Sequence, residues 1–213
     1  MKSTFLSILL LSGIFCYSQG NRKEQRIREN ERIELLDHLE PEIGDLLTYI
    51  FSLDYHSRIR STLLETLAER PIIRMIVLPS FSPEYVISLD KIGDDLLVTK
   101  IELDSNLWYS THPEQIKTSI TTKIIKPELA DSLLSLYVLA LSKTKYPDQP
   151  RITTDGTRYH FAAGTPYGLR TATKHSPRTG TRIAQLVFIT EKLIGNFDEN
   201  ELINEIERLK ERI

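Results

Sequence analysis

PIIRMIVLPSFSPEYVISLDKIGDDLLVTKIEL, residues 71–103, is the stretch that decides the fold. Residues 71–78 are apolar apart from Arg74, which is typical of a strand buried on both faces. Residues 85–89 alternate apolar with smaller or polar side chains, and residues 96–103 alternate in the same way. Proline and glycine separate the three runs and indicate turns. The stretch therefore predicts three sequential antiparallel strands, and the first of them is central in the sheet.

More strands are expected downstream. Isoleucine and threonine recur at every second position of residues 116–124, which predicts a fourth strand of an antiparallel meander with one packed face. Asp155-Gly156 is a dipeptide that favours a two-residue hairpin turn. We expect it to join residues 152–154 to residues 157–162, with a possible further strand at 169–174.

Helices are predicted on both sides of this β region. Apolar spacing near the N-terminus indicates two helices separated by Pro41 and Gly44. Pro71 and Gly195 each end a later helical pattern. Pro127 and the capping residue Asp198 each begin one. The expected helices cover residues 33–39, 46–51, 58–69, 127–141, 181–194 and 198–209. The order of elements predicts an α+β fold, with an antiparallel sheet packed against N-terminal and C-terminal helices.

The N-terminus has the pattern of a secretory signal peptide. Lys2 precedes the apolar run at 5–15, and small residues precede a cleavage point after residue 18. The run is shorter than the ~20 residues that a spanning helix needs. The alternatives are a retained anchor and a lipoprotein acylated at Cys16, although Phe15 stands where a small residue is expected. The pattern looks bacterial and predicts an exported protein, either periplasmic or extracellular.

Composition narrows the classes of partner and the domain organisation. We expect residues 19–32 to form a polar tail or a frayed helix start, and residues 33–213 to form a single α+β domain. The net charge of −2 argues against a general nucleic-acid binder. Cys16 is the only cysteine, so no disulfide can form within the chain. Acidic residues gather at 84–104 and basic residues at 151–182, which permits salt-sensitive head-to-tail self-association.

The basic region is the first candidate for a functional site. If Tyr159, Phe161 and Leu169 face the core, the opposite face carries Arg151, Arg158, His160, Arg170 and Lys174. Hydroxyl and basic residues follow before a helix start, where free N–H groups favour an anion. The predicted ligand-binding residues are Arg158, Arg170, Lys174, Arg178, Thr179 and Arg182. The competing interpretation is that Ser176 or Thr179 merely caps the helix and the charges are solvated.

A hydrolase is the alternative. His160 and His175 lie near Ser176 and Asp155, and a histidine could activate the serine as a nucleophile while an acid orients the imidazole. The serine does not stand in a Gly-x-Ser-x-Gly motif.

No cofactor or metal site is predicted. The five histidines lack metal-ligand spacing, and the acids at 90–95 lack the order of a calcium loop, so we interpret them as a polar hairpin turn. Residues 164–168 are rich in glycine but lack the ending of a phosphate loop, so they predict a turn.

Trp108 and Tyr109 stand together in a polar segment. Such a pair can anchor a partner or stack on a sugar, or it can cover the open end of a sheet. No motif identifies a family. The first hypothesis is a secreted, non-enzymatic protein that binds an envelope or extracellular partner, and the basic region makes an anionic partner the candidate.

Overall fold

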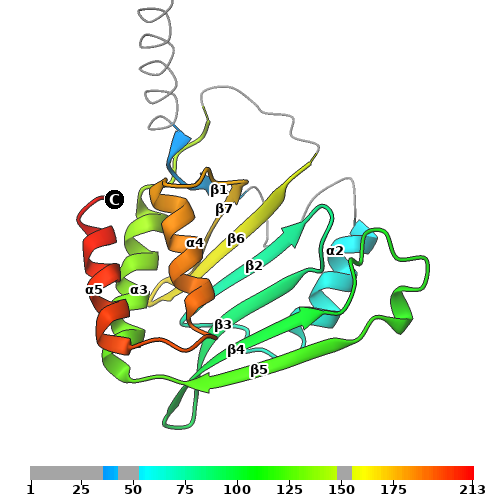
Figure 1. Cartoon of the computed structure of the whole chain (residues 1–213), viewed down its shortest axis with the longest axis horizontal. Coiled ribbons are helices and arrows are strands. Elements are labelled where there is room, and N and C mark those ends of the chain that lie inside the picture. Colours follow the sequence, from blue (N-terminus) through cyan, green and yellow to red (C-terminus); the bar gives the residue numbers. More distant parts are fainter. Residues whose placement is uncertain (1–35, 43–52, 148–154) are drawn as a thin grey trace, which may run out of the picture. The chain divides into compact units, whose positions relative to one another are not determined.

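Strand β2 (Ile73–Pro79) occupies the middle of a seven-stranded antiparallel sheet (Figure 1). The structure is a computed structural model that describes residues 36–42, 53–147 and 155–213. The strand order is β1-β7-β6-β2-β3-β4-β5. The other strands are β1 (Glu40–Pro41), β3 (Tyr85–Ile92), β4 (Asp95–Leu103), β5 (Thr118–Ile124), β6 (Thr157–Thr165) and β7 (Gly168–His175). The predicted central strand and the β2-β3-β4-β5 meander are therefore confirmed.

Helices cover both faces of the sheet. Figure 1 shows α3 (Pro127–Ser142), α4 (Arg182–Lys192) and α5 (Glu199–Lys210) on one face, and α2 (Leu53–Ile59) lies on the other. A π-helical turn, Arg60–Leu64, continues α2, and a short 3-10 turn, Pro113–Gln115, precedes β5. The α+β fold predicted from the sequence is confirmed. The face under α3, α4 and α5 is called the helix face below, and the face under α2 is called the α2 face.

The meander packs on two faces, whereas the sequence predicted one packed face. On the α2 face, Ile76, Val86 and Ile101 form a second buried cluster with Ile59 and Leu63 of the α2 region. The sequence predicted a helix over residues 58–69, but the helical segment begins earlier and ends at Leu64. Tyr55, Ile59 and Leu63 recur every four residues and form its inward face.

The predicted Asp155-Gly156 hairpin is wrong. Strand β6 pairs with β2 along one edge and with β7 along the other, so neither edge is available to residues 152–154. These three residues lie outside the described part of the chain. The hairpin that does form joins β6 to β7, where Thr165 is opposite Gly168 across Pro166-Tyr167. The turn expected at 164–168 is thus present, and the strand expected at 169–174 is β7.

The N-terminal helix prediction is only partly testable. Glu40 and Pro41 form the edge strand β1, which pairs with β7 at Thr173 and Ala172. The chain therefore changes to extended backbone where we expected a break between two helices. The predicted helix at 46–51 lies outside the described residues, as do residues 33–35 of the first one.

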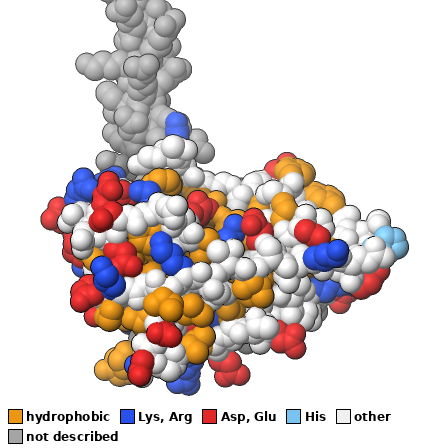
Figure 2. Space-filling model, turned by 60° about the horizontal axis from the view of Figure 1, so that its bottom comes forward, with side chains coloured by type: hydrophobic (Ala, Val, Ile, Leu, Met, Phe, Trp, Pro, Cys, Tyr) orange, Lys and Arg blue, Asp and Glu red, His pale blue; other side chains and the backbone are white. Residues whose placement is uncertain are grey.

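Strand β5 forms one edge of the sheet and is largely exposed. Its face toward α2 carries Ile120 and Ile124, which are 57% and 59% exposed. Hydrophobic side chains gather on the surface that includes this edge (Figure 2). The isoleucines that suggested a packed strand in the sequence are therefore surface residues, because the α2 region covers only part of this face.

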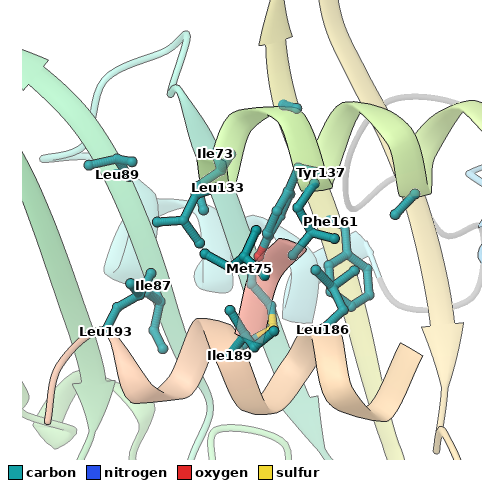
Figure 3. Packing of buried hydrophobic residues seen from close by; sticks show 14 of the residues in the cluster. Ile73, Met75, Ile87, Leu89, Leu133, Tyr137, Phe161, Leu186, Ile189 and Leu193 are labelled. Carbon is teal, nitrogen blue, oxygen red and sulfur yellow. The ribbon is translucent and has the colours of Figure 1, made fainter. Parts of the chain in front are cut away.

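The main core lies between the helix face and the three helices. Tyr137 and Leu133 of α3, Phe161 of β6 and Met75 of β2 point toward one another (Figure 3). Leu186 and Ile189 of α4, and Leu193 directly after it, pack from the neighbouring side. Tyr137 is fully buried, and its hydroxyl lies 2.8 Å from the hydroxyl of Thr190. Burying each large apolar side chain contributes about 1.5–3 kcal/mol, so this layer supplies most of the stabilising free energy. Helix α3 contacts strands β6, β7 and β2 of the sheet and also packs against α5.

Arg74, the single charge of the central run, is buried on the α2 face. Its guanidinium donates to the Ala68 carbonyl at 2.6 Å and to the Ser88 hydroxyl at 3.1 Å, and Asp90 lies 3.9 Å away. Burial raises the pKa of Asp90, and Ser88 and Arg74 oppose that effect. Asp90 thus belongs to a buried pair rather than to the polar turn expected from its acidic neighbours.

Candidate functional site

The predicted basic face is divided between the two sides of the sheet. Arg158 is opposite His175, whereas Arg170 is opposite Ala163 and Lys174 is opposite Tyr159. Directly opposed residues share a face, so Arg170 and Lys174 lie on the side of Tyr159. Arg158 and His160 lie on the α2 face. The two-residue turn sets this register and pairs even-numbered residues of β6 with odd-numbered residues of β7, so the prediction of one shared face is wrong.

Leu169 is also misplaced by the prediction. It is opposite Gly164, shares the α2 face and is 38% exposed, whereas we expected it in the core. Arg151 lies outside the described residues. The predicted set is therefore split into two pairs, with Arg158 and His160 on the α2 face and Arg170 and Lys174 on the helix face.

The other predicted binding residues make structural contacts or stand in the turn before α4. Lys174 is buried, with its ammonium 3.0 Å from Glu40. Arg182 donates to the Arg212 carbonyl at 2.9 Å. Thr181 caps α4 by accepting the Ala184 N–H, so neither Ser176 nor Thr179 is the cap. Arg178 and Thr179 are exposed in this turn.

The histidines of the hydrolase hypothesis share the α2 face, but no catalytic chain connects them to the serine. His160 is 5% exposed, and its Nδ1 lies 2.9 Å from a Glu42 carboxylate oxygen. The Ser176 hydroxyl accepts the Thr157 N–H at 3.0 Å. Within the described ranges, Ser176 has no hydrogen bond to either histidine, and Asp155 is exposed. Activation of a serine needs a hydrogen bond to a base, and the Ser176 hydroxyl is bonded to the Thr157 N–H instead.

His56 is a neighbour of this region that the sequence did not reveal. It comes from α2, and burial lowers its pKa, with His160 and Arg158 adding to the effect. Burial also lowers the pKa of His175, again with help from Arg158. Contacts between segments so distant in sequence leave no local signal.

Three exposed aromatic residues form the most distinctive surface, which we call the aromatic surface. Phe81, Trp108 and Tyr109 are 71%, 56% and 59% exposed. The rings of Phe81 and Tyr109 are stacked, with centroids 6.0 Å apart and planes 6° from parallel. Trp108 meets the half-buried Tyr55 edge to face at 5.1 Å. The sequence indicated Trp108 and Tyr109, and the turn containing Phe81 brings the third ring beside them.

Polar contacts fix the segments that carry these rings. The Glu84 carboxylate has no exposed surface and accepts the Tyr55 hydroxyl at 2.8 Å and the Leu107 N–H at 2.9 Å. Asn106 donates to the Ser82 carbonyl at 2.8 Å and accepts the Tyr109 N–H at 3.2 Å. Both aromatic segments are therefore tied to one framework. Exposed rings whose backbone is fixed lose little conformational entropy when they bind a partner.

A groove of about 430 Å³ runs beside the aromatic surface. Trp108 forms part of its wall, and α2 contributes the exposed charges of Asp54 and Arg58. The groove is lined by Asp54, Tyr55, Arg58, Leu107, Trp108, Ser110, Thr111 and Pro113. It offers aromatic faces, hydroxyl groups, one carboxylate and one guanidinium. Such a mixture can orient a polar ligand that also has an apolar face.

No protein-family model, curated protein or solved structure matches the chain. Within residues 36–42, 53–147 and 155–213, no group of three or more histidine, cysteine or acidic side chains is placed to hold a metal ion. None of the helices in these ranges is both long enough and apolar enough to cross a membrane. The geometry of the site is therefore the basis for any functional conclusion.

Proposed function

We propose that this chain is an exported, non-enzymatic binding protein that recognises a saccharide at the aromatic surface and the groove beside it. The observation that carries the proposal is a set of exposed aromatic rings on segments that Glu84 and Asn106 fix through hydrogen bonds. A sugar ring presents C–H groups on its faces and hydroxyl groups at its rim. The C–H face fits against an aromatic ring, whose face is electron-rich. The rim fits the carboxylate, guanidinium and hydroxyl groups of the groove.

Arg58 supports an acidic saccharide in particular. It is exposed in the groove, and its planar guanidinium can hold a carboxylate or sulfate through two oxygens. Asp54 lies one helical turn earlier and can accept sugar hydroxyls. The anionic partner proposed from the sequence is thus assigned to Arg58 rather than to the divided basic residues of β6, β7 and α4.

Trp108 makes the proposal easy to test, because it is the only tryptophan of the chain. Titration with neutral and acidic oligosaccharides should change its fluorescence. Calorimetry should then show binding weakened at least tenfold in Trp108→Ala and Tyr109→Ala. Phe188→Ala is a matched control, since Phe188 is 53% exposed but belongs to α4. Arg58→Gln should weaken only the acidic ligands, and added salt should do the same.

Two results would contradict this function. One is the absence of any fluorescence change or heat at millimolar saccharide. The other is saccharide binding that survives Trp108→Ala but is lost in the Arg178→Ala/Arg182→Ala pair, which would move the site to the start of α4. Export is tested separately. Mass spectrometry of the protein from the native host should find a mature chain that begins at Gln19.

A further inference from the structure

The outer edge of β5 is a regular edge without the usual protection. Thr118–Ile124 pairs with β4 in continuous register, from Thr118 opposite Leu103 to Ile124 opposite Leu97. In the part of the chain that the structure describes, no strand pairs with its other side. Natural proteins usually protect such an edge with projecting lysines, prolines, bulges or very short strands. β5 has no proline and no bulge, and its seven residues exceed a very short strand.

The single charge of β5 does not project beyond this edge. The Lys123 ammonium donates to the Gly195 carbonyl at 2.9 Å and lies 3.6 Å from the centre of the Phe197 ring. Lys123 is therefore held against the segment before α5. The remaining residues of the strand are uncharged threonine, serine and isoleucine.

The hydrogen-bond pattern shows which backbone groups face outward. The Asp104 N–H donates to the Lys117 carbonyl at one end of β5, and the Ile125 N–H donates to the Leu96 carbonyl at the other. Bonded pairs alternate along an antiparallel ladder, so odd-numbered residues of β5 bond toward β4. The N–H and C=O groups of the even-numbered residues therefore point away from β4. These residues are Thr118, Ile120, Thr122 and Ile124.

We propose that this edge pairs with the same edge of a second copy of the chain, antiparallel about a two-fold axis through Thr122. In that register Thr122 is opposite Thr122 of the second copy, and Ile120 is opposite Ile124. Each even-numbered residue meets another even-numbered residue, so the outward N–H and C=O groups meet as bonded pairs. Four exposed isoleucines, two from each chain, then become neighbours on one continuous face.

Self-complementarity is the reason to assign a second copy rather than an unrelated strand. Shifting the register by two residues places Ile120 opposite Thr122 and separates the isoleucine pairs. In the assigned register Lys123 is opposite Thr121, so no like charges are directly opposed. Threonine pairs and β-branched pairs are favourable across strands, and a two-fold interface uses one patch twice. This surface is separate from the aromatic surface, so the inference does not depend on the proposed function.

Thr122→Pro and Ile120→Lys are the test variants. The Thr122 N–H points outward, so proline removes a bond to the second copy without removing a bond to β4. Lysine at 120 places a charge where two isoleucines would meet. Ile92→Lys is the matched control, because Ile92 is also 59% exposed but lies at the end of β3. Thermal denaturation of each variant establishes that it folds.

Sedimentation velocity of the purified full chain over a wide concentration range measures the association. We expect a dimer whose dissociation constant rises at least tenfold in both β5 variants and is unchanged in Ile92→Lys. Moderate salt should leave the dimer intact, because no charged residue of one β5 strand lies across from a charged residue of the other. A monomer at every concentration would overturn the proposal. So would a dimer that salt dissociates and the folded Thr122→Pro variant retains, which would favour the head-to-tail charge association instead.

Discussion

Glu84 illustrates, at the scale of a residue, how a buried polar group can position a surface. It lies at the end of the turn before β3, and its two carboxylate oxygens bind the Tyr55 hydroxyl and the Leu107 N–H. Burial and the nearby carboxylate raise the pKa of Tyr55, so this phenol remains a proton donor at all physiological pH values. One side chain thus joins α2 to the segment that carries Trp108.

Glu84→Gln should destabilise the protein by about 1.5–3 kcal/mol, the usual contribution of hydrogen bonds to a charged group. The amide keeps the shape of the carboxylate, but its NH₂ group cannot accept a hydrogen bond. One of the two donors, the Tyr55 hydroxyl or the Leu107 N–H, then loses its acceptor. Chemical denaturation measures the loss, and saccharide affinity should fall with it. Glu114→Gln is the control, since Glu114 is 66% exposed and its contact with His112 contributes little. Equal stability of the two variants would contradict the role given to Glu84.

At the scale of an element, β6 shows how a strand accepts close neighbours on both edges. It holds β2 on one side and β7 on the other, and Gly164 faces the Pro71 backbone just beyond the last β6-β2 pair. A Cβ atom at this position would lie 2.6 Å from the Pro71 carbonyl oxygen. Real side chains do not tolerate such a contact with backbone, so the end of the β6-β2 ladder depends on glycine.

Gly164→Ala should lower the free energy of unfolding by about 1–3 kcal/mol, because the added methyl group forces the Pro71 backbone away from β6. Urea denaturation monitored by Trp108 fluorescence provides the measurement. Gly195→Ala is the comparison, since a Cβ there would meet its nearest neighbour at an ordinary 3.5 Å. If both variants showed the same small change in the free energy of unfolding, the close approach at Gly164 would not contribute to stability.

For the whole molecule, the two faces of the sheet differ in chemistry. The helix face buries a large cluster of aliphatic and aromatic side chains, together with a few polar ones such as Thr190 and Lys174. The α2 face also buries polar groups, among them Arg74, Glu84, Asp90 and His160. Hydrophobic burial on the first face supplies stability, whereas the second face uses specific polar contacts that position its elements. The candidate binding groove and the histidines both lie on this second side.

Two partly buried histidines on the α2 side predict that the free energy of unfolding depends on pH. The pKa values of His56 and His175 are lowered in the folded protein, mainly by burial. Histidine in the unfolded chain has a pKa of about 6.5, so the unfolded state takes up protons first as pH falls. The free energy of unfolding should therefore decrease as the pH falls through about 6.5. The loss stops once the pH is below the folded pKa values.

Urea midpoints across this pH range test the linkage. The His56→Gln/His175→Gln double variant should show a shallower dependence than the original chain. His112→Gln serves as the matched control, because His112 is 66% exposed. An unchanged slope in the double variant would assign the pH dependence to other groups.

The local sequence was sufficient to predict the central strand, the meander, the strand at β7 and the helices α3 to α5. Period-two and period-3.6 patterns, helix caps and proline positions act over a few residues and can be read directly. The exposure of Ile120 and Ile124 could not be predicted in this way, since their alternation matches that of a packed strand. Only the length of the covering α2 region leaves them at the surface.

The sequence by itself determined the class of fold, the absence of a disulfide and the presence of aromatic residues in a polar segment. The tertiary structure alone decided which side chains meet. A two-residue turn placed Arg158 and Lys174 on opposite faces, and β7 occupied the edge that the Asp155-Gly156 hairpin would have used. The tertiary structure also brought the Glu42 carboxylate within hydrogen-bond distance of His160, 118 positions away in the sequence. Such contacts depend on strand order and register, which arise from the packing of the whole chain rather than from neighbouring residues.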